Sequence, residues 1–423
     1  MRLVDYQRPS ALRRSRAARP ARTFRQSRRG SRGRQAGADP FQQRDVQNLR
    51  TGPRPAFVRA ALADRHHGLM DAGSYSVAFP RRWWYPVARS SELGRRPLAV
   101  TLMDSPLVVF RGARGAPAVL LDRCEHRNYP LSLGRVTGDG GLECGYHGWT
   151  YDGGGHCVRV PGLRGGRRQV HRGRHIPSHA TVEQDGIVWA WGEPDAEPIR
   201  RPFALPAVDG RGAGEVLFRR DLDSTMRASL ENALDVPHTA FLHRGIFRGG
   251  LPHAITAVRR PVDGGIVVRY LGEPVGLGPL RLPGDSGRTF DHWDRFFLPS
   301  IAQIEYAVDG WFRLVNTIVH LPMSPFRTRA WFVVRFESRL PASVVRAVVR
   351  QHGRRILRQD ADALARQTER TRSLGGERYA STELDLLGPA IWHLLRRAER
   401  AEQLDGGEAT PATVRERTIV FEA

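Results

Sequence analysis

Apolar residues recur with two different periods along this chain, and the periods predict its elements. Short runs rich in branched and aromatic residues are typical of strands. They occur at residues 106–111, 117–122, 141–144, 149–151, 255–260, 266–270, 311–321 and 330–336. Apolar positions three and four residues apart predict helices. They occur at residues 224–234, 342–372 and 384–402. This order predicts an α+β protein, with a small antiparallel β domain before an antiparallel sheet that helices flank.

Composition divides the chain further. Residues 1–50 carry 14 Arg and three Asp, have few large apolar residues and show no period, so we expect a disordered arginine-rich extension over 1–72. Met70 is an alternative start. We expect a first domain over 73–200, a second over 201–402 and a flexible tail over 403–423.

Two short motifs in the first predicted domain carry metal-binding residues. They are Cys124-Glu-His126 and, after a gap of 17 residues, Cys144-Gly-Tyr-His147. Two thiolates and two imidazoles form the ligand set of a Rieske [2Fe-2S] cluster, and they also suit zinc. Each motif supplies one Cys and one His, so each can give one ligand to each iron, which favours the cluster. The third cysteine, Cys157, is expected to be a buried structural thiol.

A second constellation lies in the larger predicted domain, directly after the helix expected at 224–234. It consists of Asp235, His238 and His243. Two neutral imidazoles and a carboxylate form the facial triad of non-haem Fe(II) oxygenases. Because Pro237 lacks an amide donor and the histidines are five residues apart, we predict a break in the helix before the histidine pair.

Both motifs, in this order, resemble the catalytic subunit of a Rieske non-haem iron oxygenase, over roughly residues 83–400. The resemblance implies that His238 and His243 bind a mononuclear Fe(II). It implies that Asp235 is the catalytic bridge between this iron and a cluster histidine, His147, of a neighbouring subunit. That bridge in turn implies a ring of subunits, which in this family is a trimer.

The resemblance also implies a third iron ligand, a carboxylate far downstream that follows a glutamine. Asp360 directly follows Gln359 and is the preferred candidate, with Asp362 as its rival. An Asp-His-Trp-Asp stretch at 291–294 also contains metal-binding residue types. We interpret that stretch as a turn entering a strand at 296–304.

The implied activity is that of a terminal oxygenase. Electrons would pass through the cluster to the Fe(II), which activates O₂ to hydroxylate, demethylate or desaturate an apolar small molecule, with an aromatic one as a candidate. A ring-cis-dihydroxylating dioxygenase alpha subunit is the alternative within the family. Outside it, the alternative is a nucleic-acid-binding protein that uses the basic arm over 1–72.

Charge and motifs also bear on partners. The net charge is +23, of which residues 1–50 contribute +11. A basic surface can steer an acidic redox partner. No Gly-x-Gly-x-x-Gly sequence opens a helix after a strand, so we expect a separate ferredoxin, flavin reductase or both as the electron donor. No apolar run is long enough to span a membrane, and a cytoplasmic protein is expected.

Overall fold

A computed structural model describes most of the chain beyond its basic arm. The expected extension at 1–72 lies outside the described residues. All described residues belong to one compact unit, Leu62–Ala423. They are residues 78–163, 174–244, 254–273, 276–277, 280–281, 290–403 and 414–422.

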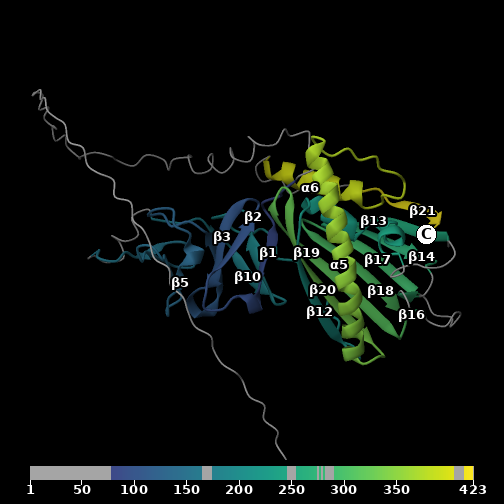
Figure 1. Cartoon of the computed structure of the whole chain (residues 1–423), viewed down its shortest axis with the longest axis horizontal. Coiled ribbons are helices and arrows are strands. Elements are labelled where there is room, and N and C mark those ends of the chain that lie inside the picture. The colour runs from purple at the N-terminus through teal and green to yellow at the C-terminus, as the bar shows by residue number, and fades with distance from the viewer. Residues whose placement is uncertain are drawn as a thin grey trace, which may run out of the picture. The chain divides into compact units, whose positions relative to one another are not determined.

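The part that carries the two cysteine motifs consists of small antiparallel sheets (Figure 1). Three sheets have the orders β1-β11-β10, β2-β3-β4-β9 and β5-β6-β7-β8. The strands are β1 (Trp84–Arg89), β2 (Leu98–Leu102), β3 (Ser105–Arg111), β4 (Pro117–Leu121), β5 (Arg135–Val136), β6 (Leu142–Glu143), β7 (Thr150–Tyr151), β8 (Cys157–Arg159), β9 (Ser178–His179), β10 (Thr181–Gln184) and β11 (Ile187–Trp191). Short 3₁₀ turns connect them at η1 (Ser90–Glu92), η2 (Ala113–Gly115) and η3 (Leu131–Leu133).

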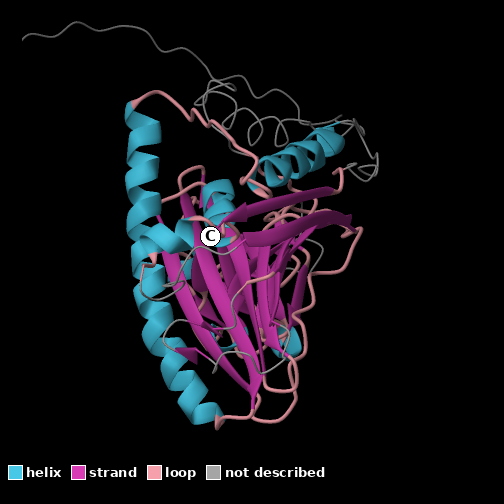
Figure 2. Ribbon diagram, turned by 90° about the vertical axis from the view of Figure 1, so that its right-hand side faces the viewer, coloured by secondary structure: helices cyan, strands magenta, loops and turns pink. Residues whose placement is uncertain are grey.

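An eight-stranded antiparallel sheet forms the larger part. Its order is β12-β20-β19-β18-β17-β14-β13-β21. Figure 2 shows its long strands running side by side. The strands are β12 (Gly214–Leu222), β13 (Ala254–Val262), β14 (Gly265–Leu271), β17 (Phe290–Phe297), β18 (Ile301–Val308), β19 (Phe312–Ser324), β20 (Arg327–Ser338) and β21 (Arg417–Glu422), while β15 (Gly276–Leu277) and β16 (Leu280–Arg281) form a separate hairpin.

Four helices accompany this sheet in the part of the chain that the structure describes. They are α3 (Met226–Ala233), α4 (His238–Leu242), α5 (Ala342–Ser373) and α6 (Gly388–Gln403). The longest, α5, crosses the face of the sheet (Figures 1 and 2). It approaches β12 closely at Gly353, where an added Cβ would come within 2.7 Å of the Phe218 ring. A glycine in mid-helix costs stability relative to alanine, but here it lets the helix lie against the sheet.

The two predicted domains pack on each other. One buried cluster contains Trp84 and Leu107 from the first part together with Val319 and Trp331 from the second. The β2–β3 turn also bonds to the end of β19, because Met103 N–H donates to the Pro322 carbonyl at 2.8 Å. The boundary between residues 200 and 201 stays a prediction, but the parts on either side of it share a core.

The sequence prediction was wrong about the C-terminal tail. We expected residues 403–423 to be flexible, but residues 417–422 form β21, which pairs antiparallel with β13. The exposed fraction alternates along β21, with Ile419 and Phe421 packed against the core. The alternation Ile-Val-Phe is too short to stand out in a polar segment, and the open edge of β13 gives it a partner.

The stretch at 291–294 is also not a turn. It lies inside β17, paired with β14 on one side and β18 on the other. The strand expected at 296–304 is instead the end of β17 and the start of β18, separated by residues 298–300. The alternation of apolar and polar residues that predicts a strand is missing here, because the buried positions include His292 and Asp294, which are buried as a hydrogen-bonded pair.

No helix among the described residues is long and apolar enough to cross a membrane.

The β21 pairing gives a test of the fold. Replacing half-buried Ile419 with aspartate places a charge against the core, and we expect the free energy of unfolding to fall by about 1–3 kcal/mol. The matched control is Val420→Asp on the same strand, whose side chain is 67% exposed. The control should change stability by about 0.5 kcal/mol or less. Urea unfolding followed by circular dichroism measures both, and equal losses would contradict the packing of β21.

Candidate metal centres and active-site cavity

The two cysteine motifs form matching loops. Cys124 N–H donates to the Tyr129 carbonyl, and Cys144 N–H donates to the Trp149 carbonyl, at 2.9 and 2.8 Å. In each loop the residue four positions after the cysteine has a positive φ, and that residue is a glycine in the second loop. Repeated backbone geometry therefore presents the same pair of ligand types twice.

The side chains of these loops converge. The His126 and His147 rings are 4.5 Å apart between centroids, and Cys124 and Cys144 are each 2% exposed. The His126 ring stacks on Trp149 with an interplanar angle of 2°. The Sγ of Cys124 lies 3.4 Å from the Tyr151 hydroxyl.

This donor set fits a Rieske cluster. The Nδ1 of His126 is a buried polar atom that makes no hydrogen bond, so the fold leaves an imidazole nitrogen for another ligand. The two thiols are buried while the His147 side chain is exposed, so one edge of the site faces solvent. Cys157, by contrast, is fully buried in the core beneath the loops and is a structural thiol, as expected.

The second centre forms where α3 ends. Thr225 caps α3, accepting a hydrogen bond from Ala228 N–H at 3.0 Å. The helix ends at Ala233, and a new short helix, α4, begins at His238 after Pro237. The predicted break is therefore confirmed. It allows His238 and His243 to face each other, with their Nε2 atoms 3.2 Å apart.

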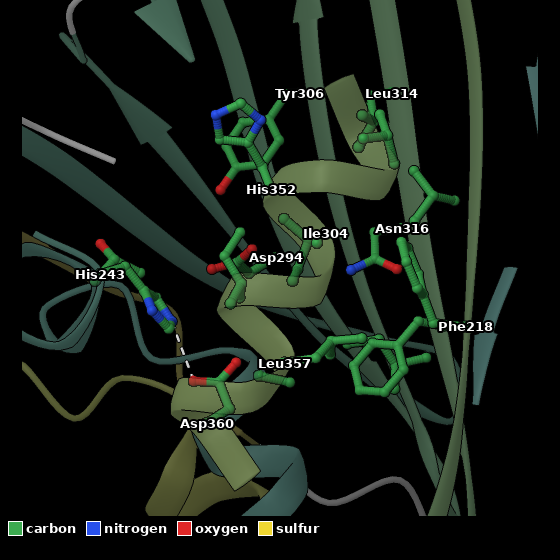
Figure 3. Close-up of a pocket in the computed structure, with 18 of the residues that line it drawn as sticks. Phe218, His243, Asp294, Ile304, Tyr306, Leu314, Asn316, His352, Leu357 and Asp360 are labelled. Atoms are coloured by element: carbon green, nitrogen blue, oxygen red, sulfur yellow. Dashed lines mark ion pairs between the residues drawn. The ribbon is translucent and has the colours of Figure 1, made fainter. Parts of the chain in front are cut away.

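Asp360 of α5 completes this group. Its Oδ1 lies 3.0 Å from His243 Nε2 and 3.7 Å from His238 Nε2 (Figure 3). One ligand atom from each of the three residues lies within 4.8 Å of the others. Asp362, the rival candidate, is exposed on α5. The structure therefore brings Asp360 to the histidines.

Neighbouring groups set the orientation of both imidazoles. The Nδ1 of His243 donates to Gln359 Oε1 at 3.0 Å, and the Nδ1 of His238 donates to the Asp235 carbonyl. In these tautomers both Nε2 atoms carry lone pairs toward the Asp360 carboxylate. Asp360 Oδ1 is itself buried without a hydrogen bond of good geometry. When both rings are neutral, three electron-pair donors thus meet at one point, and a proton or a metal ion between them satisfies this arrangement.

Electrostatics agree with this interpretation. Burial lowers the pKa of His238, but Asp235 and Asp360 outweigh burial and raise it to about 9. Burial raises the pKa of Asp360, but His238 and His243 outweigh it and hold the pKa below its ordinary value. The site therefore attracts positive charge.

A cavity of about 480 Å³ opens from this centre between α5 and the large sheet. Figure 3 shows Asp360 and His243 at one side, with Leu357, Ile304 and Leu314 among its apolar walls. Roughly 300–1,000 Å³ is the ordinary size of a small-molecule site. The centre therefore lies where a small apolar molecule can reach it.

Beside the cavity lies a buried charge cluster that sequence reasoning missed. His292 lies between Glu273 at 2.8 Å and Asp294 at 3.1 Å. Burial lowers the pKa of His292, but Asp294 and Glu273 outweigh burial and raise this pKa to about 9, while burial raises the pKa of Asp294. Glu273 is distant in sequence from residues 291–294. Its contact with His292 could be found only from the pairing of β14 with β17.

Two comparisons with protein families match consecutive parts of the chain. Residues 83–178 match the Rieske [2Fe-2S] domain, and residues 222–401 match the vanillate O-demethylase oxygenase C-terminal domain. The first match contains both cysteine motifs, and the second contains His238, His243 and Asp360.

Curated relatives agree. The chain is 35% identical over 177 residues to the oxygenase component of dicamba O-demethylase from Stenotrophomonas maltophilia, covering 40% of this chain and 49% of that protein. It is 30% identical over 241 residues to a vanillate O-demethylase oxygenase subunit from a Pseudomonas species, covering 54% and 66%. The match thus spans about half the length of the first relative.

Solved structures share the fold. Dicamba monooxygenase bound to dicamba superposes with a TM-score of 0.63 at 23% identity, covering 78% of this chain and all of that one. A structure of the caffeine-bound protein NdmA from Pseudomonas putida gives a TM-score of 0.61 at 20% identity, covering 77% and 92%. With a Rieske domain followed by an oxygenase C-terminal domain, and with this fold, the chain belongs to the Rieske non-haem iron oxygenases.

Proposed function

We propose that this protein is the terminal oxygenase component of a multi-protein oxygenase. Cys124, His126, Cys144 and His147 would hold a [2Fe-2S] cluster, while His238, His243 and Asp360 would hold a mononuclear Fe(II). When bound, the cluster supplies single electrons and the mononuclear iron supplies a centre for O₂ activation. The observation that carries the proposal is the meeting of three electron-pair donors beside an apolar cavity, in a chain that also contains a Rieske domain.

The residues around the second centre have separate tasks. Gln359 and the Asp235 carbonyl orient the two imidazoles, which keeps their Nε2 atoms directed at Asp360. The apolar walls exclude water and hold the substrate beside the centre, where a preorganised geometry is most effective. Hydroxylation or demethylation is favoured over ring cis-dihydroxylation, because the C-terminal match is to a demethylase domain. The nucleic-acid alternative is not favoured by any of these matches.

The oligomeric state that this function needs is a homotrimer, in which Asp235 would contact His147 of the partner subunit. Both groups are accessible on one chain, since the Asp235 side chain is 37% exposed and His147 is exposed. Large apolar side chains accompany them. Tyr146 is 61% exposed beside His147, and Phe241 is 85% exposed on α4. Exposed aromatic groups at both ends are typical of surfaces that another subunit covers.

The electron donor would be a separate ferredoxin, a flavin reductase or both. Exposed arginines surround the cluster loops, with Arg123 at 53%, Arg135 at 73% and Arg159 at 64% exposure. Such a surface would attract an acidic protein. The printed names of the relatives, an oxygenase component and an oxygenase subunit, describe them as parts of larger systems.

The iron assignment is tested by metal content. Wild-type protein should contain about three Fe and two inorganic sulfides per chain. Asp360→Ala should lose the mononuclear iron, leave about two Fe and keep the visible and EPR signals of the cluster. The matched control, Asp362→Ala, should keep all three. Zinc in place of iron and no sulfide, or loss of iron in the control alone, would overturn the assignment.

The bridging role of Asp235 is tested by turnover with intact metals. Asp235→Asn should retain about three Fe and the trimer, yet substrate-dependent O₂ uptake with a surrogate ferredoxin should fall by roughly 100-fold, the upper range for groups that support a metal centre. Asp223→Asn is a control, because that residue is exposed before α3. Full activity in Asp235→Asn would refute the role.

Docking of an acidic donor is tested by ionic strength. The rate of electron delivery should fall as salt rises from low to physiological concentration, because screening shortens the reach of exposed charges. Stopped-flow reduction of the cluster by a ferredoxin measures this rate. A rate that does not change with salt would contradict electrostatic steering.

A further inference from the structure

The active-site cavity continues along α5 well beyond the metal centre. One face of α5 lines the cavity, and the residues on that face recur with the spacing of the helical repeat. From Val344 to Asp360 there are sixteen residues, which span about 24 Å at 1.5 Å per residue. The cavity is therefore long as well as apolar. The lining residues on α5 include Val344, Val348, His352, Ile356 and Asp360.

The facing wall is the sheet. Alternate residues of β19 line the cavity, as expected for one face of a strand. They are Phe312, Leu314, Asn316, Ile318 and His320. Alternate residues of β18 continue this wall, and they are Ile304, Tyr306 and Val308. A molecule in the cavity thus lies between a helix face and a sheet face that are both predominantly apolar.

Both ring nitrogens of His320 are bonded within the core, to the Ser300 carbonyl and the Ser229 hydroxyl. Two further polar residues, Asn316 and His352, interrupt these apolar rows. Asn316 stands at the centre of the β19 row, and its Oδ1 is buried without a hydrogen-bond partner. His352 interrupts the α5 row eight residues before Asp360, and its Nδ1 donates to the Val348 carbonyl at 3.0 Å. In that tautomer the His352 Nε2 is an acceptor. Both residues therefore offer a hydrogen-bond acceptor to the cavity. A polar residue that breaks an apolar pattern without stabilising the core is expected at a functional position.

Charge further restricts the occupant. The chain contains 66 residues of the Lys and Arg class, all of them arginine. Yet no arginine is among the described residues that line the cavity, whereas the carboxylates of Asp235, Asp294 and Asp360 are. Asp294 is paired with His292, and Asp235 and Asp360 lie at the metal centre, so the apolar walls along α5 offer no partner to a charged group, whose desolvation there is costly. The cavity is suited to uncharged molecules.

We propose that the substrate is an elongated, uncharged and largely apolar molecule that lies along α5. A hydrogen-bond donor within it, such as a hydroxyl or N–H, would bind Asn316 or His352. Its reacting part would lie toward Asp360, and its apolar remainder would lie toward Val344. This inference rests on the proposed oxygenase function, because it identifies the substrate class of the same cavity. A carboxylate along the apolar walls would bind weakly because it would lack a cationic partner, and small phenols would bind weakly because they leave most of the cavity unfilled.

Direct binding tests the proposal with a reference probe, a probe whose hydroxyl donor is replaced by an anion, and a probe with a shorter chain. They are 4-n-octylphenol, 4-n-octylbenzoate and 4-ethylphenol. Isothermal titration calorimetry on the metal-loaded, oxidised protein measures each dissociation constant without turnover. We expect 4-n-octylphenol to bind at least tenfold more tightly than either of the others, since each buried methylene strengthens binding roughly fourfold at best.

Three variants locate the bound probe. Val348→Trp fills the part of the cavity away from Asp360, and it should weaken 4-n-octylphenol at least tenfold while changing 4-ethylphenol less than about twofold. Val420→Trp is the matched control on exposed β21, and it should change neither probe. Asn316→Leu should weaken 4-n-octylphenol about fivefold to tenfold but leave 4-n-octyltoluene, which has no donor, unchanged or tighter. Circular dichroism checks that each variant is folded.

Several results would overturn the proposal. Binding of 4-n-octylbenzoate as tight as that of the phenol would remove the charge argument. Equal affinity for the octyl and ethyl phenols, no binding of 4-n-octylphenol, or equal loss in Val348→Trp and Val420→Trp would remove the length argument. None of these results bears on the iron and sulfide content or on the loss of iron in Asp360→Ala. Failure of this inference is therefore distinguishable from failure of the proposed function.

Discussion

The convergence of three electron-pair donors at His238, His243 and Asp360 is the constraint on which the site depends. Lone pairs directed at one another repel, and a proton or a metal ion placed between them relieves that repulsion. The fold holds them together through Gln359, which accepts from His243 Nδ1 at 3.0 Å, and through the end of α3, whose last turn positions the Asp235 carbonyl beside His238. A cation suits such a site. The fold holds the three ligand atoms in place before any ion binds, so little rearrangement is needed when a metal binds.

The large sheet and α5 make this convergence possible. A helix of 32 residues crosses the strands, and the packing of Gly353 against Phe218 sets how closely it approaches them. The same helix presents Asp360 to the histidines and gives one wall to the cavity. The metal centre and the cavity therefore depend on the same helix. A shift of α5 would change both the geometry of the metal ligands and the space for substrate.

The first centre is built on a different principle. Two short loops repeat the same backbone hydrogen bonds, and each presents a buried thiol and a more accessible imidazole. Buried sulfur ligands protect a cluster from solvent, while an exposed histidine edge offers a route for electrons. The exposed arginines around these loops and the exposed aromatic residues Tyr146 and Phe241 suggest that other proteins complete this surface, as the proposed function requires.

The metal chemistry could be predicted from the sequence. The proposed ligand residues lie close together in the chain at Cys124–His126, Cys144–His147 and His238–His243, and a sequence shows such local spacing directly. It also predicted the helices at both ends of the larger part, because their apolar faces have a regular period. Only the tertiary structure brings Asp360 rather than Asp362 to the histidines, because neighbouring residues on a helix differ in the direction that they face. It alone paired β21 with β13, buried His292 between Glu273 and Asp294, and placed Asn316 and His352 in one cavity, since each of these contacts joins segments that are far apart in the chain.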